Sequence, residues 1–234
     1  MYLKRVVPQT LGLVLLVTFI GGLALSACGG GGGQEQANTP RSLPEGPKAL
    51  RPGEYRTEEF KPSLFFRVGK GWEASELQQK PYFDILHEYQ GGDYFVAISF
   101  NNPPPKVSDP RHPNKLVPAP EDWVSWFDEH PYLRTSKPQP ASVGGIEGRR
   151  LDTRVASLPE DYYSEDCLGA GVPLWPLLGG HHWCADEGYT TRTIVLESIK
   201  DETVIIDAWS ISGKFEKVLP EAKKVLDTVE WEGA

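Results

Sequence analysis

The chain has 234 residues, three cysteines and a formal net charge of −8. Such an acidic balance argues against a nucleic-acid-binding protein and against a domain that lies flat on anionic lipid, because both need a basic face. The length suits one large domain with a short appended segment, and two small domains are the alternative.

Residues 1–27 have the three parts of an export signal. Lys4 and Arg5 give a basic start, residues 11–25 are apolar, and small residues follow. The apolar run has about 15 residues, whereas a helix needs roughly 20 to cross the hydrocarbon of a membrane. A cleaved signal is therefore expected in preference to a permanent membrane helix.

The residues that close this signal stand in the order Leu25, Ser26, Ala27, Cys28. This order resembles the bacterial lipobox, which implies that the signal is removed and that Cys28 becomes the acylated first residue. Two or more acyl chains, at roughly 0.8 kcal/mol per buried methylene, hold a protein stably on a bilayer. The alternative is a plain secreted protein in which the cysteine stands by chance.

Residues 28–55 are rich in glycine, then rich in proline and polar, with no apolar periodicity. Because such a composition gives no core to bury, it predicts a flexible tether. A flexible chain of this length spans roughly 25 to 30 Å, enough to hold a domain clear of the lipid surface. The folded domain is expected over residues 56–234.

The first half of this domain is predicted to consist mainly of strands. Residues 63–68 form a short apolar strand, and residues 82–89 and 94–100 form a hairpin around a Gly-Gly turn at 90–93. The second hairpin strand is apolar on both faces, so we expect it to be covered on both sides. Residues 101–120 contain seven prolines and are expected to be a long excursion that is neither helix nor central strand.

A helix is predicted over residues 121–130. Its apolar side would consist of Trp123, Trp126, Phe127 and His130, which stand at helical spacing. We expect the two tryptophans to belong to the buried stripe of this helix, and a platform for a ligand is the alternative.

The second half continues with extended residues at 133–142 and an alternating strand at 145–156, of which one face should meet the core. Residues 189–199 and 203–211 predict a hairpin of strong strands. Residues 215–227 repeat apolar positions at i, i+3, i+4 and i+7, which predicts a terminal helix.

The order of these elements resembles the PsbP-like fold. The resemblance rests on a turn with Gly71 and Trp72, paired strands, the helix with Trp123 and Trp126, a strand from Val143 to Arg150, a final hairpin, and a terminal helix followed by Val229, Glu230 and Trp231. The group includes PsbP of photosystem II and the LpqN-type lipoproteins of actinobacterial envelopes. Over residues 60–231 it implies an α+β domain, arranged as an α/β/α sandwich around a central antiparallel sheet. Its members mostly bind or assist other proteins.

Residues 157–188 depart from that pattern and form an insert with little periodicity. Cys167 and Cys184 lie in it, and two cysteines of an exported chain most simply pair with each other. A disulfide closing this 17-step loop would contribute on the order of 3 kcal/mol. Free thiols or metal ligands are the alternatives.

The insert is also the best candidate for a site, and it has three interpretations. The first is a metal site at His181 or His182, which is not expected because adjacent histidines of an extended chain point apart and their spacing matches no zinc pattern. The second is an exposed contact surface of Trp175, His181, His182 and Trp183 for a partner protein or glycan. The third has Trp175 and Trp183 folded inward with neighbouring leucines.

No catalytic residue and no cofactor are predicted, because the chain has no G-x-S-x-G elbow, no H-E-x-x-H and no phosphate loop after a strand. We expect a monomeric, non-enzymatic binding or accessory module, anchored by lipid in a bacterial cell envelope and acting through a protein partner. One alternative is a carrier or sensor of a small molecule or lipid, which predicts a pocket of roughly 300 to 1,000 Å³ between sheet and helix. The other is a hydrolase, which predicts a cleft with two or more titratable groups in contact.

Overall fold

The computed structural model describes residues 39–75, 81–89, 95–160, 162–167, 171–177, 180, 182–200 and 202–233. The predicted export signal, the predicted acylation site Cys28, the first part of the predicted tether, the 90–93 turn and His181 lie outside the described residues. No helix in the described ranges is long and apolar enough to cross a membrane.

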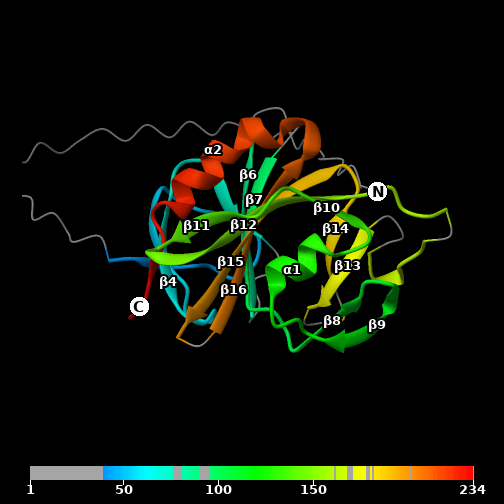
Figure 1. Cartoon of the computed structure of the whole chain (residues 1–234). Coiled ribbons are helices and arrows are strands. Elements are labelled where there is room, and N and C mark those ends of the chain that lie inside the picture. The colour runs from blue at the N-terminus through cyan, green and yellow to red at the C-terminus, as the bar shows by residue number, and fades with distance from the viewer. Residues whose placement is uncertain are drawn as a thin grey trace, which may run out of the picture. The chain divides into compact units, whose positions relative to one another are not determined.

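The described chain is built around a nine-stranded antiparallel sheet (Figure 1). Its order is β10-β12-β15-β16-β7-β6-β5-β2, and β11 pairs with β12. The strands are β2 (Lys48–Ala49), β5 (Trp72–Ala74), β6 (Tyr82–Glu88), β7 (Phe95–Asn101), β10 (Leu133–Thr135), β11 (Gln139–Val143), β12 (Ile146–Val155), β15 (Tyr189–Ile199) and β16 (Glu202–Ile211). The two predicted hairpins, β6 with β7 and β15 with β16, are confirmed, and β7 pairs with β16 at the centre of the sheet.

Smaller elements complete the domain. A four-stranded sheet has the order β1-β3-β4-β17, and two further hairpins pair β8 with β9 and β13 with β14. These strands are β1 (Arg41–Ser42), β3 (Gly53–Arg56), β4 (Leu64–Val68), β8 (Lys106–Asp109), β9 (His112–Pro118), β13 (Gly171–Pro176), β14 (His182–Asp186) and β17 (Glu230–Trp231). The helices are α1 (Trp123–Asp128) and α2 (Phe215–Leu226), with 3-10 turns η1 (Glu165–Cys167) and η3 (Ser212–Lys214).

One face of the central sheet is covered by α2 and the four-stranded sheet (Figure 1). The buried side of α2 consists of Phe215, Val218, Ala222 and Val225, which follow the predicted helical spacing. They pack with the even-numbered apolar residues of β7 and β16, which alternate with residues of the opposite face.

The opposite face is covered by α1, the β13–β14 hairpin and β8 (Figure 1). Trp123 and Phe127 of α1 are buried there, and the Asp122 carboxylate caps the helix by accepting from Ser125 N at 3.0 Å. The sheet is therefore covered on both faces, as expected for β7 and β16. The predicted α/β/α sandwich would have a layer of helices on this second face. The structure has instead one six-residue helix and hairpins there.

The prediction of a tether up to residue 55 is wrong. Residues 41–42, 48–49 and 53–56 are strands, Leu50 and Tyr55 are buried, and Leu50 N donates to the carbonyl of Trp72 at 2.8 Å. Strands of two residues are too short to show any apolar alternation, so a composition scan passes over them.

The proline-rich excursion at 101–120 contains a hairpin that the sequence did not indicate. Its strands β8 and β9 form a separate two-stranded sheet, so the prediction that no central strand runs here is correct. A two-stranded sheet tolerates Pro113 and Pro118 because each strand has one unpaired edge.

Candidate functional site

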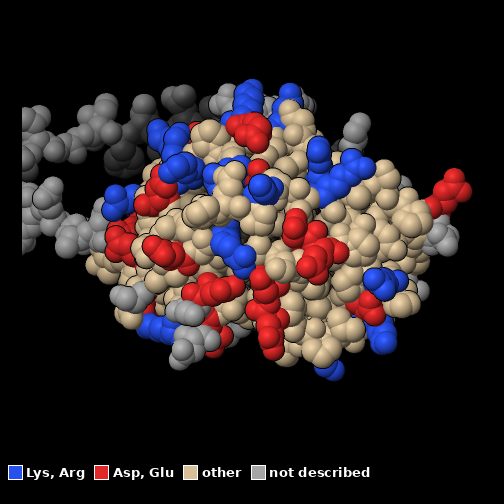
Figure 2. All heavy atoms as spheres, viewed as in Figure 1, with Lys and Arg blue, Asp and Glu red and all other residues tan. Residues whose placement is uncertain are grey.

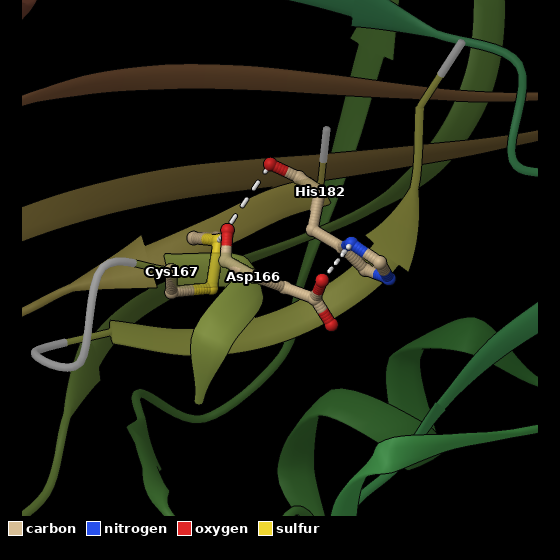
Figure 3. The surroundings of a disulfide bond; sticks show 4 residues. Asp166, Cys167 and His182 are labelled. Carbon is tan, nitrogen blue, oxygen red and sulfur yellow. Dashed lines mark hydrogen bonds and ion pairs between the residues drawn. A yellow bond between two sulfur atoms is a disulfide. The ribbon is translucent and has the colours of Figure 1, made fainter. Parts of the chain in front are cut away.

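The insert is held by a disulfide between Cys167 and Cys184, whose Cα atoms are 5.9 Å apart (Figure 3). The predicted pairing is confirmed, and it joins η1 to β14. The expectation of an irregular insert is wrong, because β13 and β14 form an antiparallel hairpin. The alternation was hidden by a shift of strand register between Pro173 and Trp175.

Trp175 is not part of an exposed contact surface, which corrects that prediction. It is 1% exposed, and its ring centroid lies 5.7 Å from that of Trp123 and 6.3 Å from that of Phe127. Leu174 is also buried, and Trp183 packs against the same cluster. The inward-packing interpretation is therefore confirmed, because β13 lies against α1 and the sheet and leaves its large side chains no path to solvent.

A cavity of about 380 Å³ lies between the central sheet and the stapled hairpin. Strands β6, β15 and β16 supply its floor, and η1, β13 and β14 supply its cover. The polar and aromatic residues that line it include Tyr82, Asp84, Thr153, Asp166, His182, Trp183, Asp186, Tyr189, Thr191, Thr193, Asp207 and Trp209.

A row of polar side chains runs across four neighbouring strands of the sheet, and all of its members except Ser99 line the cavity. Strand register places Asp84 opposite Ser99, Ser99 opposite Asp207, and Asp207 opposite Thr193. All four residues are buried. At a strand spacing of roughly 4.8 Å, the two aspartates lie on the order of 10 Å apart at their Cα atoms.

Hydrogen bonds hold Asp207 in this row. Thr193 Oγ1 donates to Asp207 Oδ1 at 2.7 Å, and Asn101 Nδ2 donates to Oδ2 at 3.5 Å. Burial raises the pKa of Asp207 to about 7, and hydrogen bonds from Thr193 and the Trp183 indole counteract part of that rise. The carboxyl therefore changes its charge close to neutral pH.

Asp84 behaves in the same way at the other end of the row. Burial raises its pKa to about 6, against hydrogen bonds from Ser75 and Tyr82 that lower it. Two buried carboxyls with raised pKa values that line one cavity are typical of a functional site. A sequence signal was available, since Asp84 and Asp207 each interrupt an apolar run of a predicted strand, but the sequence analysis sought the site in the insert.

Aromatic rings form the wall above this row. The ring centroids of Tyr82 and Trp183 are 5.5 Å apart, those of Trp183 and Trp209 6.3 Å, and those of Trp209 and Tyr189 5.7 Å. Trp209 Nε1 donates to Ser99 Oγ at 3.2 Å, which ties the wall to the polar row. The cavity thus combines an apolar wall with a few buried polar groups, as small-molecule sites do.

His182 and Asp166 form an ion pair at the covering side, with His182 Nδ1 3.3 Å from Asp166 Oδ1 (Figure 3). The side chain of His182 is 12% exposed, and neither ring nitrogen makes a well-aligned hydrogen bond within the described ranges. No group of three or more His, Cys, Asp or Glu side chains that could hold a metal ion occurs in the described part of the chain.

The outer surface shows no separation of charge on the face that Figure 2 presents. Acidic and basic side chains lie close together over α2 and the neighbouring strands. Exposed ion pairs of the described chain include Lys223 with Asp227 at 2.6 Å and Arg149 with Asp122 at 2.8 Å. Exposed pairs of this kind contribute little to stability and leave no continuous basic surface on the described part of that face.

No protein-family model and no curated protein matches the chain. The structure is similar to the solution structure of cyanobacterial PsbP (CyanoP) from Synechocystis sp. PCC 6803, with a TM-score of 0.39 and 8% identity over 78% of this chain and 94% of that chain. It is also similar to the crystal structure of LpqN, involved in cell envelope biogenesis of Mycobacterium tuberculosis, with a TM-score of 0.26 and 11% identity over 82% of this chain and 88% of that chain.

Proposed function

We propose that this protein is a non-enzymatic binding module that holds a small molecule in the cavity beneath the β13–β14 hairpin. The observation that carries the proposal is the combination of an aromatic wall with the buried row from Asp84 to Thr193. The lipobox-like segment at Cys28 supports an exported module that acts at a membrane of the cell envelope.

The buried polar groups of this cavity are poorly explained by folding alone. Thr153 is 4% exposed and lines the cavity, yet its Oγ1 has no hydrogen-bond partner among the described residues. Leaving such a group unsatisfied costs about 1 to 3 kcal/mol. A ligand that supplies the missing hydrogen bond would recover part of this energy, so the arrangement is suited to binding.

A protein-contact surface has less support. The large apolar side chains exposed in the described ranges are Leu116, Tyr163 and Ile211, which stand on three separate segments. Partner-binding surfaces place their aromatic anchors together at the centre of a patch. An accessory role in the envelope would therefore be exerted through the bound molecule.

The proposal is tested by screening small fragments with ligand-detected NMR against three proteins. In the first variant, Thr191→Phe fills the cavity, because Thr191 lines it between Trp209 and Thr153 in the sheet register. In the second, Thr190→Phe adds the same ring at a neighbouring position that does not line the cavity. Fragment binding should be lost in the first variant and kept in the second. Equal binding to all three proteins would refute the proposal.

The ion pair of His182 and Asp166 supports a second candidate, hydrolysis by general-base catalysis. A histidine beside a carboxylate can accept a proton from an attacking water. A panel of aromatic esters, incubated with the protein and with a His182→Gln variant, decides between the two functions. Turnover that disappears in the variant would establish a hydrolase, and equal background rates would leave binding as the function.

A further inference from the structure

We infer that the molecule held in this cavity is a small organic cation, an amine attached to an aromatic or apolar body. This inference rests on the proposed small-molecule binding and names the class of ligand. Its basis is the charge of the lining groups, the arrangement of the aromatic rings and an open acceptor atom in the lining.

The charged groups that line the cavity are acidic, apart from His182, which pairs with Asp166. The titratable groups that face it are Tyr82 and Asp84 from β6, Asp207 from β16, Tyr189 from β15, Asp166 from η1, and His182 and Asp186 from β14. No Lys or Arg is among the described lining residues. A cation is the ligand charge that complements such a lining, whereas an anion would be repelled.

Arg192 is a cationic side chain on a floor strand, but it lies on the other face of the sheet. Arg192 of β15 binds Asp152 with two hydrogen bonds, at 2.7 and 2.8 Å, and its guanidinium lies over the ring of Phe215 in α2. It is therefore held on the α2 side. Among the described residues, the groups that contact the Asp207 carboxyl are neutral, so this carboxyl can take up a cation that comes from outside.

The aromatic wall adds a second attraction for a cation. Trp183 and Trp209 have ring centroids 6.3 Å apart in a T-shaped arrangement, and Tyr82 and Tyr189 extend the wall at either side. A cation within about 6 Å of such ring faces is stabilised by their negative charge density, most strongly when it is removed from water. The same rings give apolar contact to the body of the ligand.

An open acceptor atom points to a cation that carries N–H groups. Thr153 Oγ1 in the cavity lining has no hydrogen-bond partner among the described residues, and the residue is 4% exposed. A protonated amine can donate to a carboxylate and to a hydroxyl oxygen at once, whereas a quaternary ammonium or a neutral hydrocarbon cannot.

The cation should bind more tightly as pH rises. The pKa of Asp84 is raised to about 6 and that of Asp207 to about 7, so at pH 5 both carboxyls are protonated and offer no charge. An amine that requires one ionised carboxylate gains up to about tenfold in affinity per pH unit below the pKa of that carboxyl. Affinity should rise between pH 5 and pH 7 and level off above.

The test compares three probes of similar shape by isothermal titration calorimetry at pH 7.5. They are phenethylamine, which is a cation, 2-phenylethanol, which is neutral, and 3-phenylpropionate, which is an anion. Phenethylamine should bind at least about tenfold more tightly than the alcohol, as expected for a charge-assisted hydrogen bond. The anion should not bind.

Two variants sharpen the test. Asp207→Asn should bring the affinity for phenethylamine down to within about threefold of that for 2-phenylethanol, without change for the alcohol. Asp227→Asn removes the same charge from the exposed end of α2 and should leave all three affinities unchanged. Asp84→Asn removes the other buried carboxyl of the cavity, so the test can still be made if Asp207→Asn does not fold.

The outcomes separate this inference from the function on which it rests. If the alcohol binds as tightly as the amine, or if both aspartate variants keep the full affinity for the amine, the cation inference is overturned while small-molecule binding stands. Absence of amine binding overturns it as well. If Thr191→Phe leaves the binding of every probe unaltered, the cavity is not the site and the proposed function fails.

Discussion

Replacing Asp207 by asparagine should stabilise the ligand-free protein at neutral and alkaline pH. Asp207 is 1% exposed, and its pKa is raised from 3.8 to about 7 by burial. Since one pKa unit corresponds to about 1.36 kcal/mol, ionisation of this carboxyl costs the folded state up to about 4 kcal/mol. Asparagine removes that cost.

The direction of the pH dependence follows from which state binds the proton. Below pH 3.8 both the folded and the unfolded chain hold the proton, so Asp207 adds no pH dependence. Between pH 3.8 and about 7 the unfolded chain releases it while the folded chain keeps it, so the stability of the wild type falls as pH rises. Above pH 7 both states are ionised and the difference stays constant.

The asparagine can be accommodated by the groups already present. Its carbonyl oxygen can accept from Thr193 Oγ1, as Asp207 Oδ1 does now at 2.7 Å. Its amide can donate to Oδ1 of Asn101, which lacks a partner in the described structure, once the Asn101 amide turns over. The hydrogen bonds with Thr193 and Asn101 are therefore kept, and the electrostatic gain should exceed the loss of a charged acceptor for the Trp183 indole N–H.

Urea unfolding from pH 4 to pH 8 measures this effect, with Asp227→Asn as the control of equal charge. The difference in unfolding free energy between Asp207→Asn and wild type should be within about 1 kcal/mol at pH 4 and grow to about 3 to 4 kcal/mol in favour of the variant at pH 8. A constant difference across this range would show that Asp207 ionises normally and would refute the reasoning on the buried row.

Three further predictions concern the disulfide in the cover of the cavity, the buried Trp175 and the acid stability of the fold. Changing Cys167 and Cys184 together to serine should lower the unfolding free energy by on the order of 3 kcal/mol, measured in urea, while reduction of the wild type should lower it equally. Trp175→Ala should cost about 3 to 5 kcal/mol in the same assay, because the side chain is fully buried against Trp123, and a loss below about 1 kcal/mol would mean that it is exposed. Burial lowers the pKa of His130 from 6.5 to about 4, so as pH falls the unfolded chain takes up this proton before the folded chain does. The unfolding free energy of the wild type should therefore fall by up to about 3 kcal/mol between pH 6.5 and pH 4. His130→Asn should not show this loss, and an equal slope in both proteins would contradict the assignment.

The elements that could be predicted from the sequence are those in which the spacing of apolar residues matches the face that the fold buries. Helix α2 buries one continuous face, so its apolar period is visible over twelve residues. Strand β15 shows a short apolar run from Ile194 to Leu196 beside a hairpin connection. Trp123 of α1 was correctly assigned to the core, and Trp126 is half-buried against it. Elements of this kind need no knowledge of their neighbours.

The short elements could not be predicted, because tertiary contacts define them. Strand β2 has two residues, and its partner β5 is distant in sequence. Strands β13 and β14 are polar or contain proline, and the disulfide and the sheet hold them together. The sequence left Trp175 open between an exposed contact surface and inward packing, because the fold of its segment depends on contacts with α1.

The candidate site emerged from strand order across the sheet. Asp84 and Asp207 are more than a hundred residues apart, and each stands within an apolar run of its strand. They meet the same cavity only because β7 pairs with both β6 and β16, in a register that aligns them with Ser99. The two acids can be read from the sequence, but the strand pairing and register that bring them to one cavity cannot.

Titration of the tryptophan indole N–H signals with phenethylamine, followed by ¹⁵N NMR at pH 7.5, tests the central claim most directly. The indole N–H of Trp209 donates to Ser99 in the cavity floor, whereas that of Trp231 donates to the Val143 carbonyl at 3.0 Å on the other side of the sheet. Binding in the cavity should shift the Trp209 signal in a saturable manner and leave the Trp231 signal in place. Equal shifts of both signals, or no shift of the Trp209 signal, would contradict the assignment of this cavity as the binding site.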